Sequence, residues 1–116
     1  MERYETMQML DYDLISDIIN TMFEVNEEIK SADNYIGEAM KLKPTAKEMA
    51  DSKVAMSADE LKHADGLTST VNKMMEKLKA EKNPCYAVMA MFWHFMRENQ
   101  AEWITKVKLK HEQYKK

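Results

Sequence analysis

The sequence has very little of the residues that break helices or build sheets. Its 116 residues include two glycines and two prolines, and no run of valine, isoleucine or threonine alternates with polar residues. Glycine and proline mark turns, and half-buried strands show such alternation, so we expect few turns and no sheet. These absences predict an all-α fold.

Cysteine and long apolar runs are also scarce. The single cysteine, Cys85, has no internal disulfide partner, which agrees with a reducing compartment and excludes a thiolate metal cluster. No apolar stretch approaches the roughly 18 residues of a membrane-spanning helix. The start, Met1-Glu-Arg-Tyr-Glu, lacks the basic-then-apolar pattern of a signal peptide. We therefore expect a cytoplasmic protein with no membrane partner.

The charges are distributed unevenly along the chain. Residues 1–40 carry ten acidic residues against Arg3 and Lys30, whereas residues 106–116 carry five lysines against Glu112. An acidic half attracts cations. With a net charge of −3 and only a short basic tail, the chain is a poor candidate for nucleic acid binding.

Two proline-containing breaks divide the chain into three long helices. Pro44 disfavours helix in the residue before it, and Thr45-Ala-Lys-Glu48 has the pattern of a capping box. Asn83 can cap the next helix, with Pro84 at its first position. The predicted helices of this single domain, residues 1–116, span about residues 11–42, 46–81 and 84–113, where the first begins near Asp11 or Asp13.

Apolar side chains recur at three- and four-residue steps along each predicted helix. The first helix carries Leu14, Ile18, Thr21 or Met22, Val25, Ile29, Ala32, Ile36 and Met40. The second reads Met49, Met56, Glu60, His63 or Ala64, Leu67, Val71, Met74 and Leu78. The third carries Tyr86, Met89, Trp93, Met96, Trp103, Val107 and Tyr114, with Val88, Phe92 and Phe95 beside them. Three such rods enclose little interior, so we expect an oligomer.

Glu60 and His63 interrupt the apolar stripe of the second helix. Residues three apart project the same way from a helix, so both side chains can bind one metal ion. Glu28 lies sixteen residues before Pro44 and Glu60 sixteen after it (44−28 and 60−44), so a hairpin turning at Pro44 brings them level. Glu28 is expected to point inwards, because it lies beside the apolar stripe, and Glu27 outwards.

An uncompensated buried carboxylate costs on the order of several kcal/mol, so a cation is the simplest partner for these acids. Ligation by carboxylates with few imidazoles favours iron or manganese over structural zinc. A di-iron bundle uses two lone glutamates and two Glu-x-x-His pairs. One hairpin supplies half of that set, in Glu28, Glu60 and His63, and a homodimer would complete it.

These residues also carry a resemblance to a known family. The segment Glu27-Glu-Ile-Lys-Ser-Ala-Asp-Asn-Tyr-Ile-Gly-Glu-Ala39, followed by Asp59-Glu-Leu-Lys-His-Ala-Asp65, resembles the ferritin-like superfamily, most of all the short encapsulated, rubrerythrin-type di-iron proteins. In that family a helical hairpin dimerises into a four-helix bundle with one ferroxidase centre.

The resemblance implies Glu28 and His63 as terminal iron ligands, Glu60 as the bridging carboxylate and Tyr35 as a neighbour of the metals. It also implies oxidation of ferrous iron by oxygen or peroxide. Two departures stand out. Lys30 replaces an outward acid of the family, and the end, His111-Glu-Gln-Tyr-Lys-Lys116, is not a cargo tail, so a protein shell as partner is not supported.

The residues and the resemblance leave two functions open. The first is a ferroxidase with a di-iron site, or manganese in its place, shared between two subunits of a homodimer or larger homo-oligomer. The second is a non-enzymatic helical oligomerisation or interaction module, with a structural metal or none. His94 is expected about 16 Å from His63, too far to share its metal. His111, near a lysine-rich end, is interpreted as a surface histidine.

Overall fold

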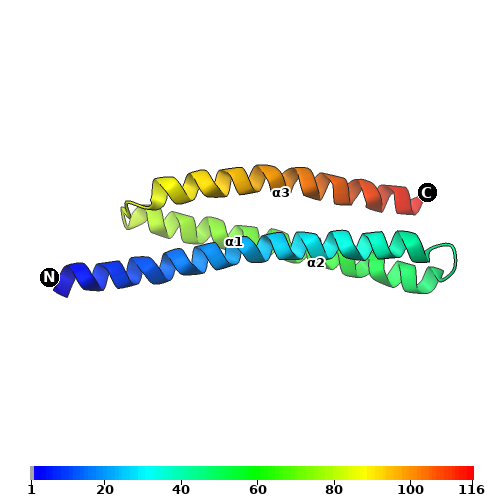
Figure 1. Ribbon diagram of the computed structural model, residues 1–116, viewed down its shortest axis with the longest axis horizontal. Helices are drawn as coiled ribbons and strands as arrows, with labels where there is room; N and C mark the ends of the chain where they lie inside the picture. The colour runs from blue at the N-terminus through cyan, green and yellow to red at the C-terminus, as the bar shows by residue number, and fades with distance from the viewer. Residues whose placement is uncertain (1) are drawn as a thin grey trace.

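The computed structural model describes the backbone of residues 2–116 and the side chains of residues 12–116. The chain forms three helices, α1 (Glu2–Leu42), α2 (Lys47–Ala80) and α3 (Tyr86–Lys115). They lie side by side as a rod with extents of 67 × 21 × 15 Å, in which α1 and α3 run in the same direction and α2 runs against them (Figure 1). The all-α prediction is confirmed over these residues, none of which is in a strand.

The start of α1 and the cap of α2 differ from the sequence prediction. α1 begins at Glu2, well before Asp11 or Asp13. The predicted capping box at Thr45 is wrong, because α2 begins after Ala46 without a side-chain cap. Thr45 instead lies in the turn, where its backbone N–H donates to the carbonyl of Leu42 at 3.0 Å.

The turn between α2 and α3 combines two backbone motifs. The N–H groups of Lys82 and Asn83 donate to the carbonyls of Lys79 and Leu78, which is the Schellman arrangement of a helix end. Lys82 has a φ of 56°, a left-handed conformation that costs an L-residue about 1–2 kcal/mol. Asn83 then accepts a hydrogen bond from the Cys85 N–H at 2.8 Å within this turn. α3 itself begins at Tyr86, after Cys85 and without a side-chain cap, so the predicted helix start, with Asn83 as cap and Pro84 at the first position, is wrong.

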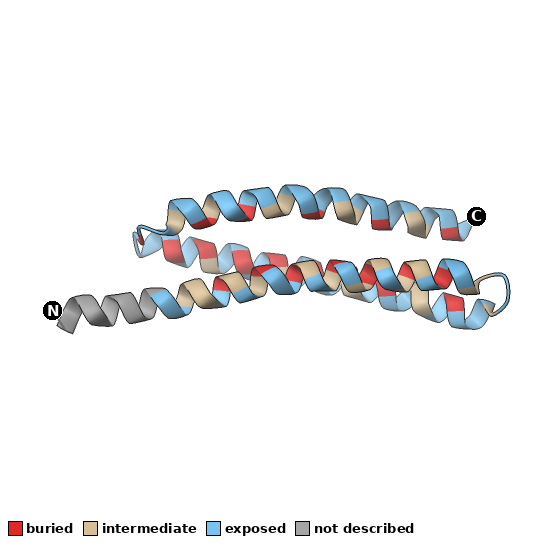
Figure 2. Cartoon of the chain, viewed as in Figure 1, coloured by how far each residue is buried: buried red, intermediate tan, exposed pale blue. Residues whose placement is uncertain are grey.

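The core lies mainly between α1 and α2 (Figure 2). On α1 the buried side chains are Ile18, Met22, Val25, Ile29, Ala32, Ile36 and Ala39. On α2 they are Ala50, Ser57, Ala64, Thr68, Val71, Met75 and Leu78. The predicted α1 stripe is confirmed from Ile18 to Ile36, whereas Leu14 is only partly buried and, at the other end, Ala39 is buried and Met40 is not.

The buried stripe of α2 lies one residue later than predicted at four positions, where Ala50, Ser57, Thr68 and Met75 are buried in place of Met49, Met56, Leu67 and Met74. Met49 and Met56 are 59% and 39% exposed, and the small residues Ala50 and Ser57 are buried in their place. With Ala64 they form a seven-residue repeat of small side chains on the face of α2 that meets α1. Small side chains allow two helices to approach closely, which accounts for the tight packing of this pair.

α3 packs on its own hairpin and contacts α1 through polar side chains. Gln100 Nε2 donates to Asn26 Oδ1 at 2.7 Å, and Trp103 Nε1 donates to Asp33 Oδ2 at 3.0 Å. Lys110 Nζ donates to the other oxygen of Asp33 at 2.6 Å. Directional bonds of this kind set the register of α3 against α1.

A second set of polar contacts joins α3 to α2. Trp93 Nε1 donates to Asn72 Oδ1 at 2.8 Å, and Arg97 donates to Thr68 Oγ1 at 3.3 Å. Near the end of α3, the Tyr114 hydroxyl donates to Asp51, and this bond raises the pKa of Tyr114 to about 12. α3 thus rests against both helices of the hairpin.

Three helices packed side by side leave three outer flanks, one between each pair. We refer to them as the α1–α2, α2–α3 and α1–α3 flanks. None of the helices over residues 2–116 is long and apolar enough to cross a membrane.

The pairing of Asp33 with α3 makes the attachment of that helix sensitive to acid. Burial raises the pKa of Asp33, but the bonds from Lys110 and Trp103 outweigh it and hold the pKa below 3.8. A carboxyl whose pKa is lowered by folding stabilises the native state above its unfolded pKa and loses this effect as pH falls through the folded pKa. Asp33 therefore contributes stability at neutral pH.

We predict that Asp33→Asn lowers the free energy of unfolding by about 1 kcal/mol near neutral pH. The difference from wild type should disappear as the pH falls below 3.8, the ordinary pKa of the group. Urea unfolding across this pH range measures the free energy of unfolding of the variant and of wild type. The control is Glu102→Gln, which removes an exposed ion pair with Lys106 on α3. This substitution should change the free energy of unfolding little. A pH-independent loss in Asp33→Asn would refute the assignment.

Candidate functional site

The hairpin brings together the three side chains that the sequence places level with one another. Glu28 from α1 and Glu60 and His63 from α2 each offer a ligand atom, and these atoms all lie within 4.8 Å of one another. The inward position of Glu28 is confirmed, because its side chain is 23% exposed while Glu27 lies on the exposed face. One helical hairpin therefore gathers two carboxylates and one imidazole.

Glu28 carries an oxygen that lacks a hydrogen bond. Its Oε2 is buried and has no hydrogen-bond partner among the described residues. His63 Nδ1 lies 3.3 Å away, outside hydrogen-bond geometry, and its side chain is 62% exposed. Buried polar atoms are nearly always paired, since leaving one unpaired costs about 1–3 kcal/mol and more when it is charged. Glu28 Oε2 thus has an ion-pair contact with His63 but no hydrogen bond among the described residues.

The cluster opens onto the α1–α2 flank, away from α3. Asn26 bonds to α3, and Glu28 is two residues further along, which turns it about 160° around the helix. Thr68 also bonds to α3, and His63, five residues earlier, is turned about 140° from it. α3 therefore neither covers the cluster nor supplies it with a ligand.

Tyr35 lies outside the cluster of its own chain. It follows Glu28 on the same face of α1, about 10 Å further along the helix axis. The Nζ of Lys53 lies 5.3 Å from the centre of its ring and 3.2 Å from Glu38 Oε2. Its position beside metal ions stays a prediction.

Apolar side chains frame the cluster on the same flank. Leu14 and Leu42 lie two heptads from Glu28 along α1, and both are partly buried. On α2, Met56 lies one turn before Glu60, and Leu67 one turn after His63. Met56 is 39% exposed. On α2 a partly exposed apolar border, Met56 and Leu67, thus flanks the polar cluster, whereas the α1 residues one turn from Glu28, Glu24 and Ser31, are polar.

The other two histidines lie outside the cluster. His94 is exposed, and its Nε2 lies 3.0 Å from Glu98 Oε1, so its exclusion from the site is in line with the sequence analysis. His111 differs from the sequence prediction. Its side chain is partly buried, and its Nε2 lies 2.9 Å from Ser57 Oγ. The interpretation of His111 as a surface histidine is wrong, since α3 stays packed against α2 up to its last turns.

The Ser57 hydroxyl determines the tautomer of His111. Its single proton is donated to the carbonyl of Ala32 at 2.6 Å, so its oxygen must accept from His111 Nε2–H. Burial lowers the pKa of His111, and so does the charge of Lys115. The sequence prediction did not include the buried contact role of Ser57. The seven-residue spacing of Ala50, Ser57 and Ala64, all with small side chains, could have indicated it.

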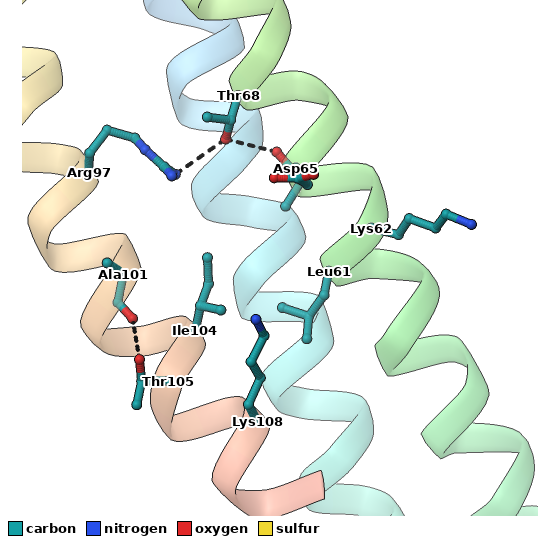
Figure 3. A pocket seen from close by; sticks show the side chains of 10 residues that line it. Leu61, Lys62, Asp65, Thr68, Arg97, Ala101, Ile104, Thr105 and Lys108 are labelled. Carbon is teal, nitrogen blue, oxygen red and sulfur yellow. Dashed lines mark hydrogen bonds between the residues drawn. The ribbon is translucent and has the colours of Figure 1, made fainter.

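A groove of about 560 Å³ lies on the α2–α3 flank, apart from the cluster. Figure 3 shows Arg97 and Lys108 reaching into it from α3, whereas Lys62 points away. Leu61 and Ile104 form its apolar walls. The groove holds none of the three clustered side chains, so its size does not mark the candidate metal site.

No protein-family model matches this chain, and neither a curated protein nor a solved structure does.

We predict that protonation of His111 loosens the attachment of α3. A histidine whose pKa is lowered by folding stabilises the native state above the unfolded value of 6.5 and loses this effect as pH falls. Wild type should therefore lose stability below pH 6.5. His111→Gln, which retains a side-chain donor, should lose less over the same range. Thermal unfolding followed between about pH 8 and pH 5 tests this, and parallel curves for the two proteins would contradict it.

Proposed function

We propose that this chain is a ferritin-like di-iron carboxylate protein that oxidises ferrous iron at a site shared between two copies. The observation that carries the proposal is the cluster of Glu28, Glu60 and His63, within which a buried carboxylate oxygen has no hydrogen-bond partner. Such a group is stabilised by a cation, and the ligand set of two carboxylates and one imidazole suits iron or manganese.

Two copies are required because one hairpin provides three ligands for what is a two-metal site in this architecture. The α1–α2 flank around the cluster is not covered by α3 and has an apolar border that includes Met56. A second hairpin placed on this flank by a two-fold axis would supply the other Glu28, Glu60 and His63. It would also bury the apolar border and form a four-helix bundle.

The proposed roles follow the positions of the three side chains. Glu28 and His63, one on each helix, would be terminal ligands, and Glu60 would bridge the two metal ions. Iron is the substrate: two ferrous ions lose two electrons in total, and one molecule of oxygen or hydrogen peroxide takes them up with two protons. The proposed place of Tyr35 beside the metal ions rests on the family resemblance alone, because Tyr35 lies about 10 Å from Glu28 along α1.

A non-enzymatic interaction module is the second candidate. It is favoured by the number of large apolar side chains that the chain exposes, among them Val88 and Phe95 at 71% and 57%. Under this alternative Glu28 and His63 form an ion pair without a metal, and the exposed side chains bind another protein or other copies of the chain.

We predict that Glu60→Ala and His63→Ala each reduce the rate of ferrous iron oxidation at least about 100-fold, while helix content is retained. Stopped-flow absorbance after mixing with ferrous iron, together with oxygen consumption, measures the rate, and circular dichroism measures the helix content. The matched control is His94→Ala, which removes an exposed histidine from another Glu–His pair on α3. This variant should oxidise iron like wild type.

Anaerobic titration of wild type with ferrous iron provides the decisive binding result. We expect two metal ions per pair of chains and a rise in melting temperature, because a ligand that binds the native state alone stabilises it. If the protein binds neither iron nor manganese, the di-iron proposal is refuted and the interaction module is the function that remains.

We predict that Met56→Glu prevents the two hairpins from pairing, because it places a charge on the apolar border one turn from Glu60. Iron oxidation should fall together with the loss of this interface, although all three ligands remain. Ala55→Glu, on the neighbouring exposed position of α2, is the control and should keep both properties. Full oxidation by Met56→Glu at wild-type rate per chain would show that the site does not need a second copy.

A further inference from the structure

All three phenylalanines of the chain lie on the surface. Phe23, Phe92 and Phe95 are 52%, 42% and 57% exposed. Val88, one turn before Phe92, is 71% exposed. Phenylalanine is among the residues most often fully buried, so the exposure of every copy is informative.

The hydrogen bonds between α1 and α3 show that these side chains lie at the same height. Asn26 pairs with Gln100, and since both helices run in the same direction, residues 74 apart lie level. By this offset Phe92 and Phe95 are level with residues 18 and 21 of α1 (92−74 and 95−74). Phe23 lies just beyond that height.

The same side chains lie on the α1–α3 flank, turned away from α2. On α1, Phe23 lies one turn before Asn26, on the side of α1 opposite the buried stripe. On α3, Arg97 reaches α2, and Phe95, two residues earlier, is turned about 160° from it. Tyr12, two heptads before Asn26 and 72% exposed, extends the same flank. We call Tyr12, Phe23, Val88, Phe92 and Phe95 the aromatic patch.

The aromatic patch is large enough to form an interface with a copy of itself. An aromatic side chain has a surface of about 150–250 Å², so the exposed fractions correspond to roughly 500 Å² of apolar surface per chain. Two facing patches bury roughly 1,000 Å², which is about the lower limit of a stable protein interface. None of the five side chains is charged, so pairing them leaves no charge unpaired within the patch.

We propose that the aromatic patch packs against the same patch of a second copy around a two-fold axis. An uncharged apolar surface can face a copy of itself without like-charge repulsion, and a two-fold contact between identical surfaces closes on itself. The interface lies on a different flank from the Glu28 cluster, so it is independent of the proposed iron site. A chain with both interfaces would form assemblies larger than a dimer.

The double variant Phe92→Glu/Phe95→Glu tests the proposal, because four carboxylates would face one another across the two-fold axis. We expect the particle mass, measured by sedimentation velocity, to fall to half that of wild type. Phe23→Glu places the charge on α1 and should have the same effect if the double variant is poorly folded. Met49→Glu is the matched control, since Met49 is an equally exposed apolar residue on α2, away from the α1–α3 flank, and the mass of this variant should equal that of wild type.

Two results would overturn the proposal. One is an unchanged mass in the patch variants, and the other is an equal loss of mass in Met49→Glu. If the mass is unchanged but wild type alone binds phosphatidylcholine vesicles, the patch faces a lipid surface instead. The iron site is tested separately, because patch variants should retain iron oxidation per chain, whereas Met56→Glu should lose it with the patch interface intact.

Discussion

The close contact between α1 and α2 is the constraint on which the rest of the structure depends. At its centre the buried Ser57 hydroxyl donates to the carbonyl of Ala32, within a seam of small side chains that lets the two backbones approach. This contact sets the height of one helix against the other. Glu60 lies one turn beyond Ser57, and Glu28 one turn before Ala32. The same hydrogen bond that aligns the hairpin therefore also brings the acidic side chains together.

The attachment of α3 is of a different kind. Ser57 also accepts a hydrogen bond from His111, so the contact between α1 and α2 extends to the third helix. Elsewhere α3 is held by the tryptophans, Gln100 and Lys110, whose partners are polar side chains of the hairpin. Because each polar contact has a specific partner, α3 has one register, and the two flanks that it borders differ in chemistry. The α2–α3 flank is a groove with Arg97 and Lys108, and the α1–α3 flank carries the aromatic patch together with Lys106 and Lys110 further along α3.

Much of the fold and the three members of the cluster were predictable because they depend on local rules. Proline positions defined the breaks, periodicity defined the apolar stripe of α1, and equal spacing from Pro44 made Glu28 and Glu60 level. The methionines of α2 were misassigned because hydrophobicity favours Met49 and Met56, whereas close packing selects the small neighbours Ala50 and Ser57. His111 was misassigned because its partner, Ser57, is distant in sequence.

The sequence by itself determined that the chain is helical, where its hairpin turns, and which side chains meet at the Glu28 cluster, because helix geometry and chain length set these features. Only the tertiary structure decided that α3 packs on its own hairpin and leaves the cluster uncovered. It also decided that the three phenylalanines share an exposed flank. These features depend on hydrogen bonds between residues about 20–80 positions apart, and local periodicity carries no information on such pairings.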